Sequence, residues 1–382
     1  MPSRLAGLLC AGAAALALPA HAQFANFKLY GTLNLDLEFI RGAQVDGPNP
    51  TVNRLSSNSS RFGIRGTEYI GGGLAAIYQF ESSVQADTGG SALTSRETFV
   101  GLQSEWGTVK MGKFLTPYDD IHPIFGNAPT LTTSVLSTAA LWAQGTQNKG
   151  QGGFDARLGN SIRYDSPTSN GFTGEVQYST RDSSGNADGA AGDNGEHLSE
   201  LRHAKVWSLG GFYGKGPIDF GVVFERNYRV RAVGRHDDAF SISGAYDFGE
   251  ASRVFNARLA VIYERLTYDT LDGNLKRDFY GISATVPAGG GSIYAFWGRA
   301  SDGKGTTADG TQVGGLTKGP GTASEQWELS YTYNLSLRSL VYVGYVKINN
   351  RANAAYTFNI NDYAIAPGGK PAAFVLGIAH FF

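Results

Sequence analysis

The segment Ala372–Phe382 (A-A-F-V-L-G-I-A-H-F-F) decides the fold class of this 382-residue chain. Counted in twos from the end, its residues form two registers: Phe382, His380, Ile378, Leu376 and Phe374 in one, and Phe381, Ala379, Gly377 and Val375 in the other. One face is therefore large and mostly apolar, and the other is mostly small. Such alternation over about ten residues is what a membrane-spanning strand requires. An edge strand of a soluble β-protein shows the same pattern, so this segment alone leaves both interpretations open.

The same alternation recurs along the chain. Near the beginning, Gly31, Leu33, Leu35, Leu37 and Phe39 alternate with Thr32, Asn34, Asp36 and Glu38, and residues 172–179, 240–248 and 326–333 repeat the pattern. A β-sandwich buries its apolar face in a core, whereas a membrane barrel turns it toward lipid. Alternation alone does not separate these two architectures.

The connections between strands do separate them. The pattern predicts strands near residues 27–40, 59–70, 73–85, 95–104, 107–115, 157–167, 171–181, 203–213, 217–228, 238–248, 252–268, 277–286, 290–300, 324–334, 338–350 and 372–382. Short turns such as 71–72 and 214–216 alternate with long polar links such as 42–58, 182–202, 301–323 and 351–371. Long links at one rim and short turns at the other are typical of an outer-membrane barrel. We therefore expect an all-β protein, a transmembrane antiparallel β-barrel of about sixteen strands with an aqueous lumen.

The N-terminus predicts export. Arg4 precedes an apolar run over residues 5–18, and Ala20-His21-Ala22 supplies the small residues of a cleavage site. This order of features is that of a secretory signal. The alternative, a single transmembrane anchor, would need a run of about 20 residues. We expect residues 1–22 to be a signal peptide and residues 23–382 to form the barrel.

Composition excludes several classes of protein. Cys10 is the only cysteine and lies in the expected signal, so neither disulfides nor thiolate metal sites are expected. The 32 Lys+Arg and 33 Asp+Glu residues nearly balance, which gives no support to nucleic-acid binding. No Gly-x-Ser-x-Gly or His-Glu-x-x-His motif occurs. We therefore expect no catalytic, metal or cofactor site, although an outer-membrane barrel enzyme remains an alternative.

One link differs from the others. Residues 116–156 form the longest connection and carry many apolar side chains, namely Ile121, Ile124, Phe125, Val135, Leu136, Leu141 and Trp142. A link of this composition is expected to pack on protein. In a barrel with a wide lumen, folding inward against the wall achieves that.

Several motifs resemble a known family. Residues 60–68 (S-R-F-G-I-R-G-T-E) and 72–81 (G-G-L-A-A-I-Y-Q-F-E) resemble the second and third strands of Gram-negative general porins, most closely the β-proteobacterial branch. Residues 96–102 with 106–112 resemble the fourth and fifth strands, and residues 163–167 with 171–178 resemble the sixth and seventh. With Leu29-Tyr30-Gly31 at the start and Phe382 at the end, the match spans the whole expected mature chain.

The resemblance implies a function and a site. General porins are trimeric outer-membrane channels for passive diffusion of ions and small hydrophilic solutes, and their loop 3 folds inward to narrow the pore. Carried over by motif, the arginines on the wall of the constriction are Arg61, Arg96 and Arg157, and the opposing acid on the loop is Asp120. The C-terminal Phe382 is expected to be read by the barrel-insertion machinery. Outer-membrane lipid and lipopolysaccharide are expected to surround the barrel, and no cofactor is implied.

The chain departs from the family pattern in loop 3. Two positions that often carry acids hold Ile124 and Ala128, and the next acid on the loop is Asp155. Three fixed cations facing one carboxylate would leave a positive excess, which concentrates anions at distances below the Debye length of about 8 Å. We therefore predict anion preference. Two alternatives remain: the arginines pair with strand carboxylates such as Glu97 and Asp165, or the protein is a substrate-specific channel or receptor.

Overall fold

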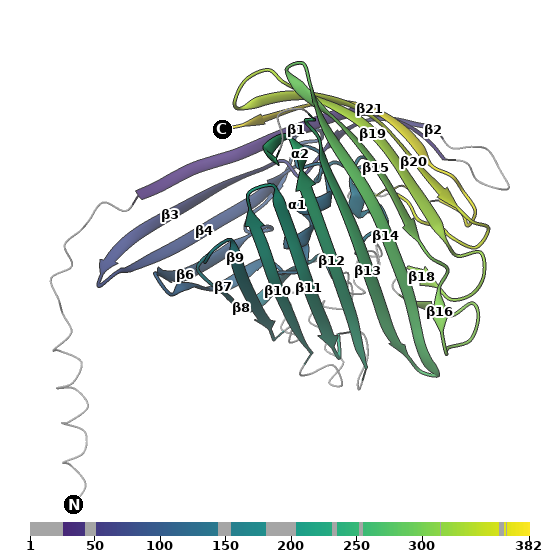
Figure 1. The fold of residues 1–382 in the computed structure, drawn as a ribbon, viewed down its shortest axis with the longest axis horizontal. Coiled ribbons are helices and arrows are strands. Elements are labelled where there is room, and N and C mark those ends of the chain that lie inside the picture. Colours follow the sequence, from purple (N-terminus) through teal and green to yellow (C-terminus); the bar gives the residue numbers. More distant parts are fainter. Residues whose placement is uncertain are drawn as a thin grey trace, which may run out of the picture.

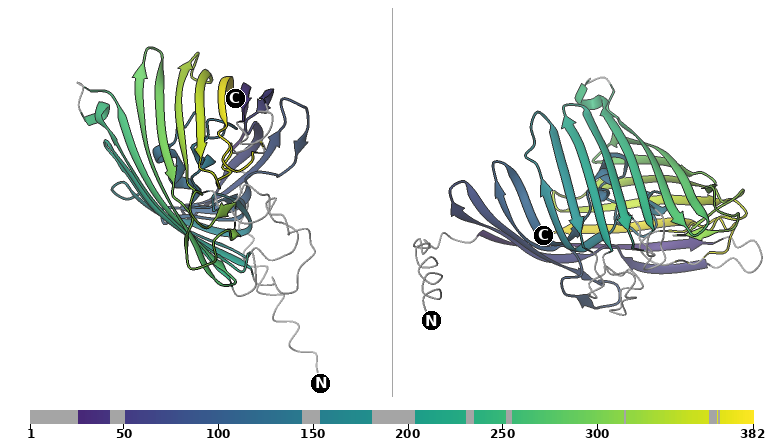
Figure 2. Two further views of the ribbon diagram at one scale, coloured as in Figure 1. Left: turned by 90° about the vertical axis from the view of Figure 1, so that its right-hand side faces the viewer. Right: turned by 90° about the horizontal axis from the view of Figure 1, so that it is seen from below.

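A computed structural model describes residues 26–42, 51–143, 154–180, 204–230, 235–251, 255–313, 315–358, 363 and 365–382. The expected signal peptide, residues 1–22, lies outside this range, as does the whole of the predicted link 182–202. Within it, no helix is both long and apolar enough to cross a membrane. Figures 1 and 2 show long tilted strands that curve around a common interior.

The wall is one closed antiparallel sheet. Its strands are β1 (Asn26–Arg41), β2 (Thr51–Ser57), β3 (Arg61–Gly71), β4 (Leu74–Val84), β6 (Thr98–Ser104), β7 (Gly107–Leu115), β8 (Arg157–Asp165), β9 (Phe172–Ser179), β10 (Lys205–Lys215), β11 (Ile218–Tyr228), β12 (His236–Asp247), β13 (Arg258–Thr270), β14 (Gly273–Ala288), β15 (Gly291–Ala300), β19 (Ser324–Asn334), β20 (Ser339–Asn350) and β21 (Ala372–Phe381). Because β2 and β3 are two halves of one wall strand, the barrel has sixteen strands. The predicted antiparallel β-barrel and its strand count are confirmed.

Short elements decorate the links. Four strands of two residues each are β5 (Ser91–Ala92), β16 (Lys304–Gly305), β17 (Gln312–Val313) and β18 (Leu316–Thr317). Among the described residues, the helices are η2 (Asp119–Ile121), α1 (His122–Phe125), η3 (Thr138–Ala140) and α2 (Phe248–Ala251). Three of these four helices fall in the link after β7, so that link has local structure of its own.

The last strand closes the ring by pairing with the first. Thr32 of β1 faces Phe381 of β21, and the register continues to Arg41 opposite Ala372. Gly31 and Phe382 then exchange two backbone hydrogen bonds, of 3.0 and 3.1 Å. Closure leaves the wall without a free edge, as a sheet in lipid requires.

One predicted boundary was wrong. Residues 51–57, expected to belong to a long link, form β2 and pair with β1 from Leu35 to Arg41. Between β2 and β3 the chain bulges, with Ser59 at a φ of 53°. The polar sequence T-V-N-R-L-S-S reads as loop, yet Arg54 is held on the strand by a 2.5 Å ion pair with Glu38.

The wall is apolar outside and polar inside. On β1, Leu33, Leu37 and Phe39 are 42–46% exposed, whereas Asn34, Asp36 and Glu38 are at most 3% exposed. The register that sequence patterning marks as apolar therefore points away from the interior, the reverse of a soluble β-protein. This orientation settles the choice left open by the alternation, because only a lipid solvent accepts an apolar belt around the whole wall.

Candidate pore constriction

Two of the predicted arginines share one carboxylate. Arg96 Nε lies 2.5 Å from Glu81 Oε1, and Arg61 Nε lies 3.6 Å from Glu81 Oε2. The backbone fixes this arrangement, because Arg96 N donates to Glu81 O just before β6 begins. Tyr30 Oη also donates to Glu81, at 3.0 Å. One negative charge thus serves two positive ones on the inner face of β3, β4 and the start of β6.

The third predicted arginine, Arg157, opens β8 opposite Leu115 of β7. It interacts electrostatically with Arg96 and Asp119, and more weakly with Glu97 and Glu81. Its buried Nε has no hydrogen-bond partner among the described residues. The structure therefore brings the three arginines into one electrostatic group, although Arg157 is not held in an ion pair by a described residue.

The fourth predicted residue, Asp120, is paired elsewhere. Its Oδ2 accepts from Arg163 Nη2 at 2.6 Å. Arg163 also contacts Asp165 at 2.5 Å and Glu175 at 2.9 Å, so three acids surround one guanidinium. The acid that stands beside Arg157 is Asp119.

Sequence reasoning missed Glu81 and Arg163. Glu81 shares a register with Gln79 and Ser83 and sits opposite Gly63, two residues along β3 from Arg61. The sequence shows that Glu81 lies on the same face of its strand as Gln79 and Ser83. It does not show the pairing register between β3 and β4, which brings Glu81 close to both arginines. The alternative that the arginines pair with strand carboxylates holds in a different form from the one expected, with Glu81 as the partner of Arg61 and Arg96.

Two loop carboxyls have altered acidity. Burial raises the pKa of Asp155 to about 6, with a further upward contribution from Glu264 and an opposing one from Arg157. Burial, together with Asp155 and Asp120, raises the pKa of Asp119 well above its usual value. Both residues are mostly buried and keep a small exposed fraction, so water in the interior still reaches them. These acids carry less than a full negative charge in mildly acidic solution.

The apolar residues of the link after β7 pack on protein. The seven apolar residues named above are all buried, with Phe125, Leu141 and Trp142 fully so. Trp142 stacks on Tyr118 with ring centroids 5.6 Å apart, and His122 lies 4.7 Å from the same indole. Burial lowers the pKa of His122 to about 3, so its ring is neutral, and its Nε2 contacts Thr138 Oγ1 at 2.7 Å.

A buried ion pair on the wall holds this link. Glu264 of β13 and Arg277 of β14 contact each other, with side chains 0% and 1% exposed. Glu264 Oε1 accepts from Tyr118 Oη at 2.8 Å and from Ala143 N at 2.7 Å. Arg277 Nη1 donates to Leu141 O at 2.6 Å. Both ends of the segment 116–143 are thus fastened to the same pair, which we call the anchor pair.

The middle of the segment is fastened to other strands. Phe125 O accepts from Ser283 Oγ at 2.6 Å and from Tyr294 Oη at 2.8 Å, and Ile124 O accepts from Arg258 Nη1 at 2.6 Å. Ser137 O accepts from Gln326 Nε2 at 3.0 Å. These donors lie on the inner face of β13, β14, β15 and β19.

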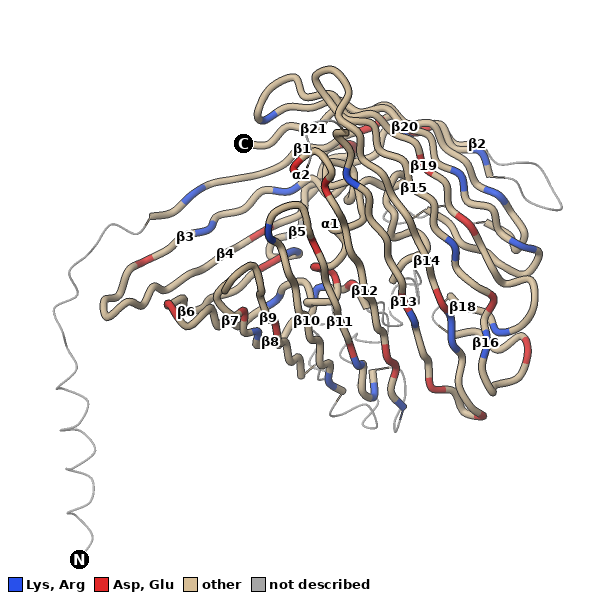
Figure 3. The backbone as a smooth tube through the Cα atoms, viewed as in Figure 1, with Lys and Arg blue, Asp and Glu red and all other residues tan. Residues whose placement is uncertain are grey.

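The two charge groups lie across the barrel from each other. Glu81 is on the third wall strand and Glu264 on the eleventh, so they lie eight positions apart around a ring of sixteen. Figure 3 shows charged residues along the wall strands, both near β3 and β4 and near β13 and β14. In the part of the chain that the structure describes, no cluster of His, Cys, Asp and Glu could hold a metal ion.

Comparisons with known proteins agree with this architecture. A family model described as Gram-negative porin matches residues 9–353. An outer membrane porin protein of Bordetella pertussis is 26% identical, and outer membrane porin protein 32 of Delftia acidovorans is 22% identical, each alignment covering 94% of both chains. Among solved structures, an anion-selective porin from Comamonas acidovorans matches with a TM-score of 0.73 at 22% identity, covering 94% of this chain and all of the other. A trimer form of OmpT of Vibrio cholerae matches with a TM-score of 0.63 at 14% identity, covering 94% and 99% of the two chains.

Proposed function

Since the chain belongs to the Gram-negative porin family and forms an outer-membrane channel, we propose that it passes small hydrophilic solutes and ions passively, with a preference for anions. Transport of this kind needs no cofactor, because the gradient of the solute drives it. The relatives are channels and not enzymes.

The observation that carries the anion preference is the sharing of Glu81 by Arg61 and Arg96. One carboxylate neutralises one of the two guanidinium groups, and Arg157 adds a third cation. Glu97 is occupied by Gln79 Nε2 at 3.3 Å and by Leu115 N at 3.5 Å. The excess is smaller than a count of Asp120 alone would give, because Glu81 and Glu97 both contribute negative charge.

We further propose that the 116–156 link is the element that narrows the channel. Its contacts with the inner face of β13 to β19 support this proposal, because a segment fastened there occupies part of the lumen. The narrower the aqueous path, the less the fixed charges are screened. Ions crossing the remaining space would then pass Arg61, Arg96 and Arg157.

Two likenesses support selectivity and assembly. A solved structure with the same fold is an anion-selective porin, and another is a trimer. We propose that this protein also forms a homotrimer in the outer membrane. Recognition of Phe382 by the barrel-insertion machinery remains a prediction.

The test is the zero-current potential of the purified protein in a planar bilayer under a KCl gradient. A potential of the sign set by chloride supports the proposal, and one set by potassium contradicts the anion preference while leaving the channel. The control is Arg226→Gln, because Arg226 lies on the outward register of β11 and pairs with Asp238. A shift in that variant as large as in Arg96→Gln would contradict the assignment of the constriction.

A further inference from the structure

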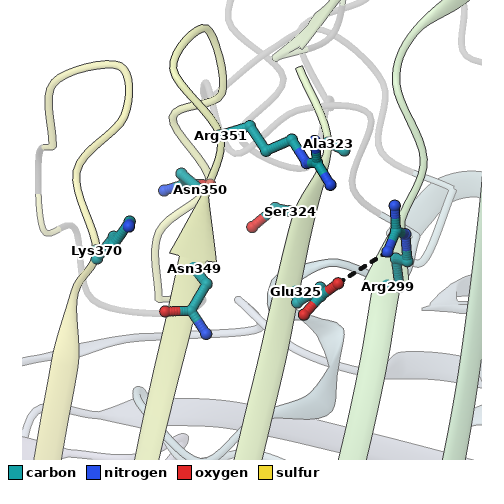
Figure 4. Close-up of a pocket in the computed structure, with 8 residues that line it drawn as sticks. All are labelled: Arg299, Ala323, Ser324, Glu325, Asn349, Asn350, Arg351 and Lys370. Atoms are coloured by element: carbon teal, nitrogen blue, oxygen red, sulfur yellow. Dashed lines mark hydrogen bonds and ion pairs between the residues drawn. The ribbon is translucent and has the colours of Figure 1, made fainter. Parts of the chain in front are cut away.

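Outside the lumen, a charged pocket lies at the rim of three strands. It has a volume of about 270 Å³ and is lined by Arg299, Ala323, Ser324, Glu325, Asn349, Asn350, Arg351 and Lys370 (Figure 4). These residues come from the ends of β15, β19 and β20 and from the approach to β21. All four positions adjoin the long links 301–323 and 351–371, so the pocket is at the rim opposite to the short turns. In an outer-membrane barrel that rim is extracellular.

The pocket is on the lipid-facing side of the wall. Arg299 pairs in register with Glu325, and Glu325 with Asn349, forming one row across three strands. The row next to it toward the middle of the membrane is Trp297, Trp327 and Lys347, on the same outward register. Trp327 is 50% exposed, and its ring centroid lies 6.1 Å from that of Trp297.

The tryptophan row fixes the depth of the pocket. Tryptophan on the outward face of a barrel marks the interface between hydrocarbon and headgroups. Two residues along a strand rise by about 6.7 Å, so the charged row lies at the level of the lipid headgroups. Whatever occupies this pocket in the membrane belongs to that layer.

The pocket also carries an uncompensated positive charge. Arg299 donates to Glu325 Oε1 at 2.9 Å, which neutralises the only acid in the lining. Arg351 and Lys370 are exposed, and neither forms an ion pair with a described residue. Two outward arginines on neighbouring strands each have an acid of their own, since Arg226 pairs with Asp238 at 2.7 Å and Arg265 with Asp278 at 2.7 Å.

We propose that this pocket binds the phosphorylated headgroup of a lipid in the outer leaflet. Arginine and lysine are the side chains that bind phosphate, and arginine does so with two parallel donors. The volume suits a phosphate with its neighbouring sugar and not a whole lipid, whose acyl chains would lie on the apolar wall around Trp297 and Trp327. Cations at a membrane surface gain further from the negative charge of the leaflet.

The test measures binding of lipid A to the purified full-length mature protein in detergent by native mass spectrometry. The probes are bisphosphorylated lipid A, its dephosphorylated form, and inorganic phosphate as a competitor. The variants are Arg351→Gln with Lys370→Gln, the opposite change Glu325→Gln, and the control Arg226→Gln. Single-channel conductance confirms that each variant is folded, since none of these residues lines the proposed constriction.

We expect the double variant to bind bisphosphorylated lipid A roughly tenfold more weakly than the wild type. Glu325→Gln is expected to bind it more tightly, and Arg226→Gln to leave binding unchanged. Equal binding by wild type and double variant, or equal binding of both lipid forms, overturns the proposal. Full displacement of the lipid by millimolar inorganic phosphate also overturns it, because the site would then recognise free phosphate and not a lipid.

Discussion

Two groups of glutamate and arginine on opposite sides of the inner wall, the anchor pair and the group of Glu81 with two arginines, differ in burial and in charge balance. The anchor pair Glu264 and Arg277 is at most 1% exposed, and its remaining hydrogen bonds go to Tyr118, Leu141 and Ala143. Around Glu81, by contrast, Arg61 and Arg96 are 25% and 13% exposed and share one acid. The same residue types therefore hold a segment in place where they are buried, and remain partly exposed and unevenly matched in charge around Glu81.

From this contrast we expect that the number of arginines on the wall does not by itself set selectivity. Arg163 contacts three acids, and Arg277 contacts Glu264 and donates to Leu141 O, so we expect both to add little to the field in the lumen. Arg61 and Arg96 share the single carboxylate of Glu81, and Arg157 forms no ion pair with a described residue. We expect ion selectivity to depend on the local excess of positive charge at side chains that water can still reach.

Breaking the anchor pair should have the largest effect. Arg277→Met leaves Glu264 buried without its partner, which costs about 3–5 kcal/mol. We expect a lower unfolding temperature, measured in detergent, together with noisier and larger single-channel conductance as the 116–143 segment loosens. The double variant Glu264→Met with Arg277→Met should recover much of the thermal stability, since neither charge is then left alone. Unchanged unfolding and conductance in the single variant would refute the role of the pair.

Removing a charge from the other group should change selectivity and leave stability nearly intact. At 4 Å in water a unit charge contributes about 1 kcal/mol, so Arg61→Gln, Arg96→Gln or Arg157→Gln should each lower the chloride-to-potassium permeability ratio by about fivefold. The zero-current potential measures this ratio. Three variants with wild-type selectivity would show that ions do not pass this group.

Lowering the pH should increase the anion preference. Burial raises the pKa of Asp155 to about 6, so this carboxyl loses negative charge as pH falls from 7.5 to 5, and the pKa of its neighbour Asp119 is also raised. The cations beside them, Arg157 above all, then dominate, and anion preference should rise by a smaller factor than any arginine variant removes.

The raised pKa of Asp155 also predicts how the stability of the fold depends on pH, namely that its contribution is larger at low pH. A carboxyl whose folded-state pKa lies above its unfolded value stabilises the fold below the unfolded pKa, and this contribution falls as pH rises through the folded pKa. Selectivity measured against pH in Asp155→Asn checks the assignment. A pH response identical to that of the wild type would place the titrating group elsewhere.

The smallest effect on ion selectivity is expected at the two positions where family acids are missing. Ala128 is exposed, so Ala128→Asp should move selectivity slightly toward cations without disturbing the fold. Ile124 is 9% exposed and packs so closely on β11 that a Cβ at Gly221 would lie 2.9 Å from its Cδ1. Ile124→Asp should therefore lower the unfolding temperature instead. The reverse result in the two variants would mean that the segment is packed differently.

Much of the fold followed from local pattern. Each of the sixteen wall strands overlaps a strand that alternation and turn residues predicted, including β10 and β11, although β13 begins six residues after its predicted start. The errors concern elements that depend on a partner: β2 is a strand because Arg54 meets Glu38, and β14 begins at Gly273, four residues before the predicted start, because it continues to pair with β13. A sequence shows which face of a strand a residue lies on, but not which residue of a neighbouring strand it pairs with.

The sequence by itself determined the alternating registers, the closing strand, the apolar link and the arginines on the inner face, because each depends on side chains a fixed number of residues apart. Only the tertiary structure decided which charges meet. Asp120 binds Arg163, Glu81 joins Arg61 to Arg96, and Glu264 and Arg277 hold the segment 116–143. These contacts depend on strand register and on the path of a long segment across the barrel, and ion pairs are decided over a few ångströms.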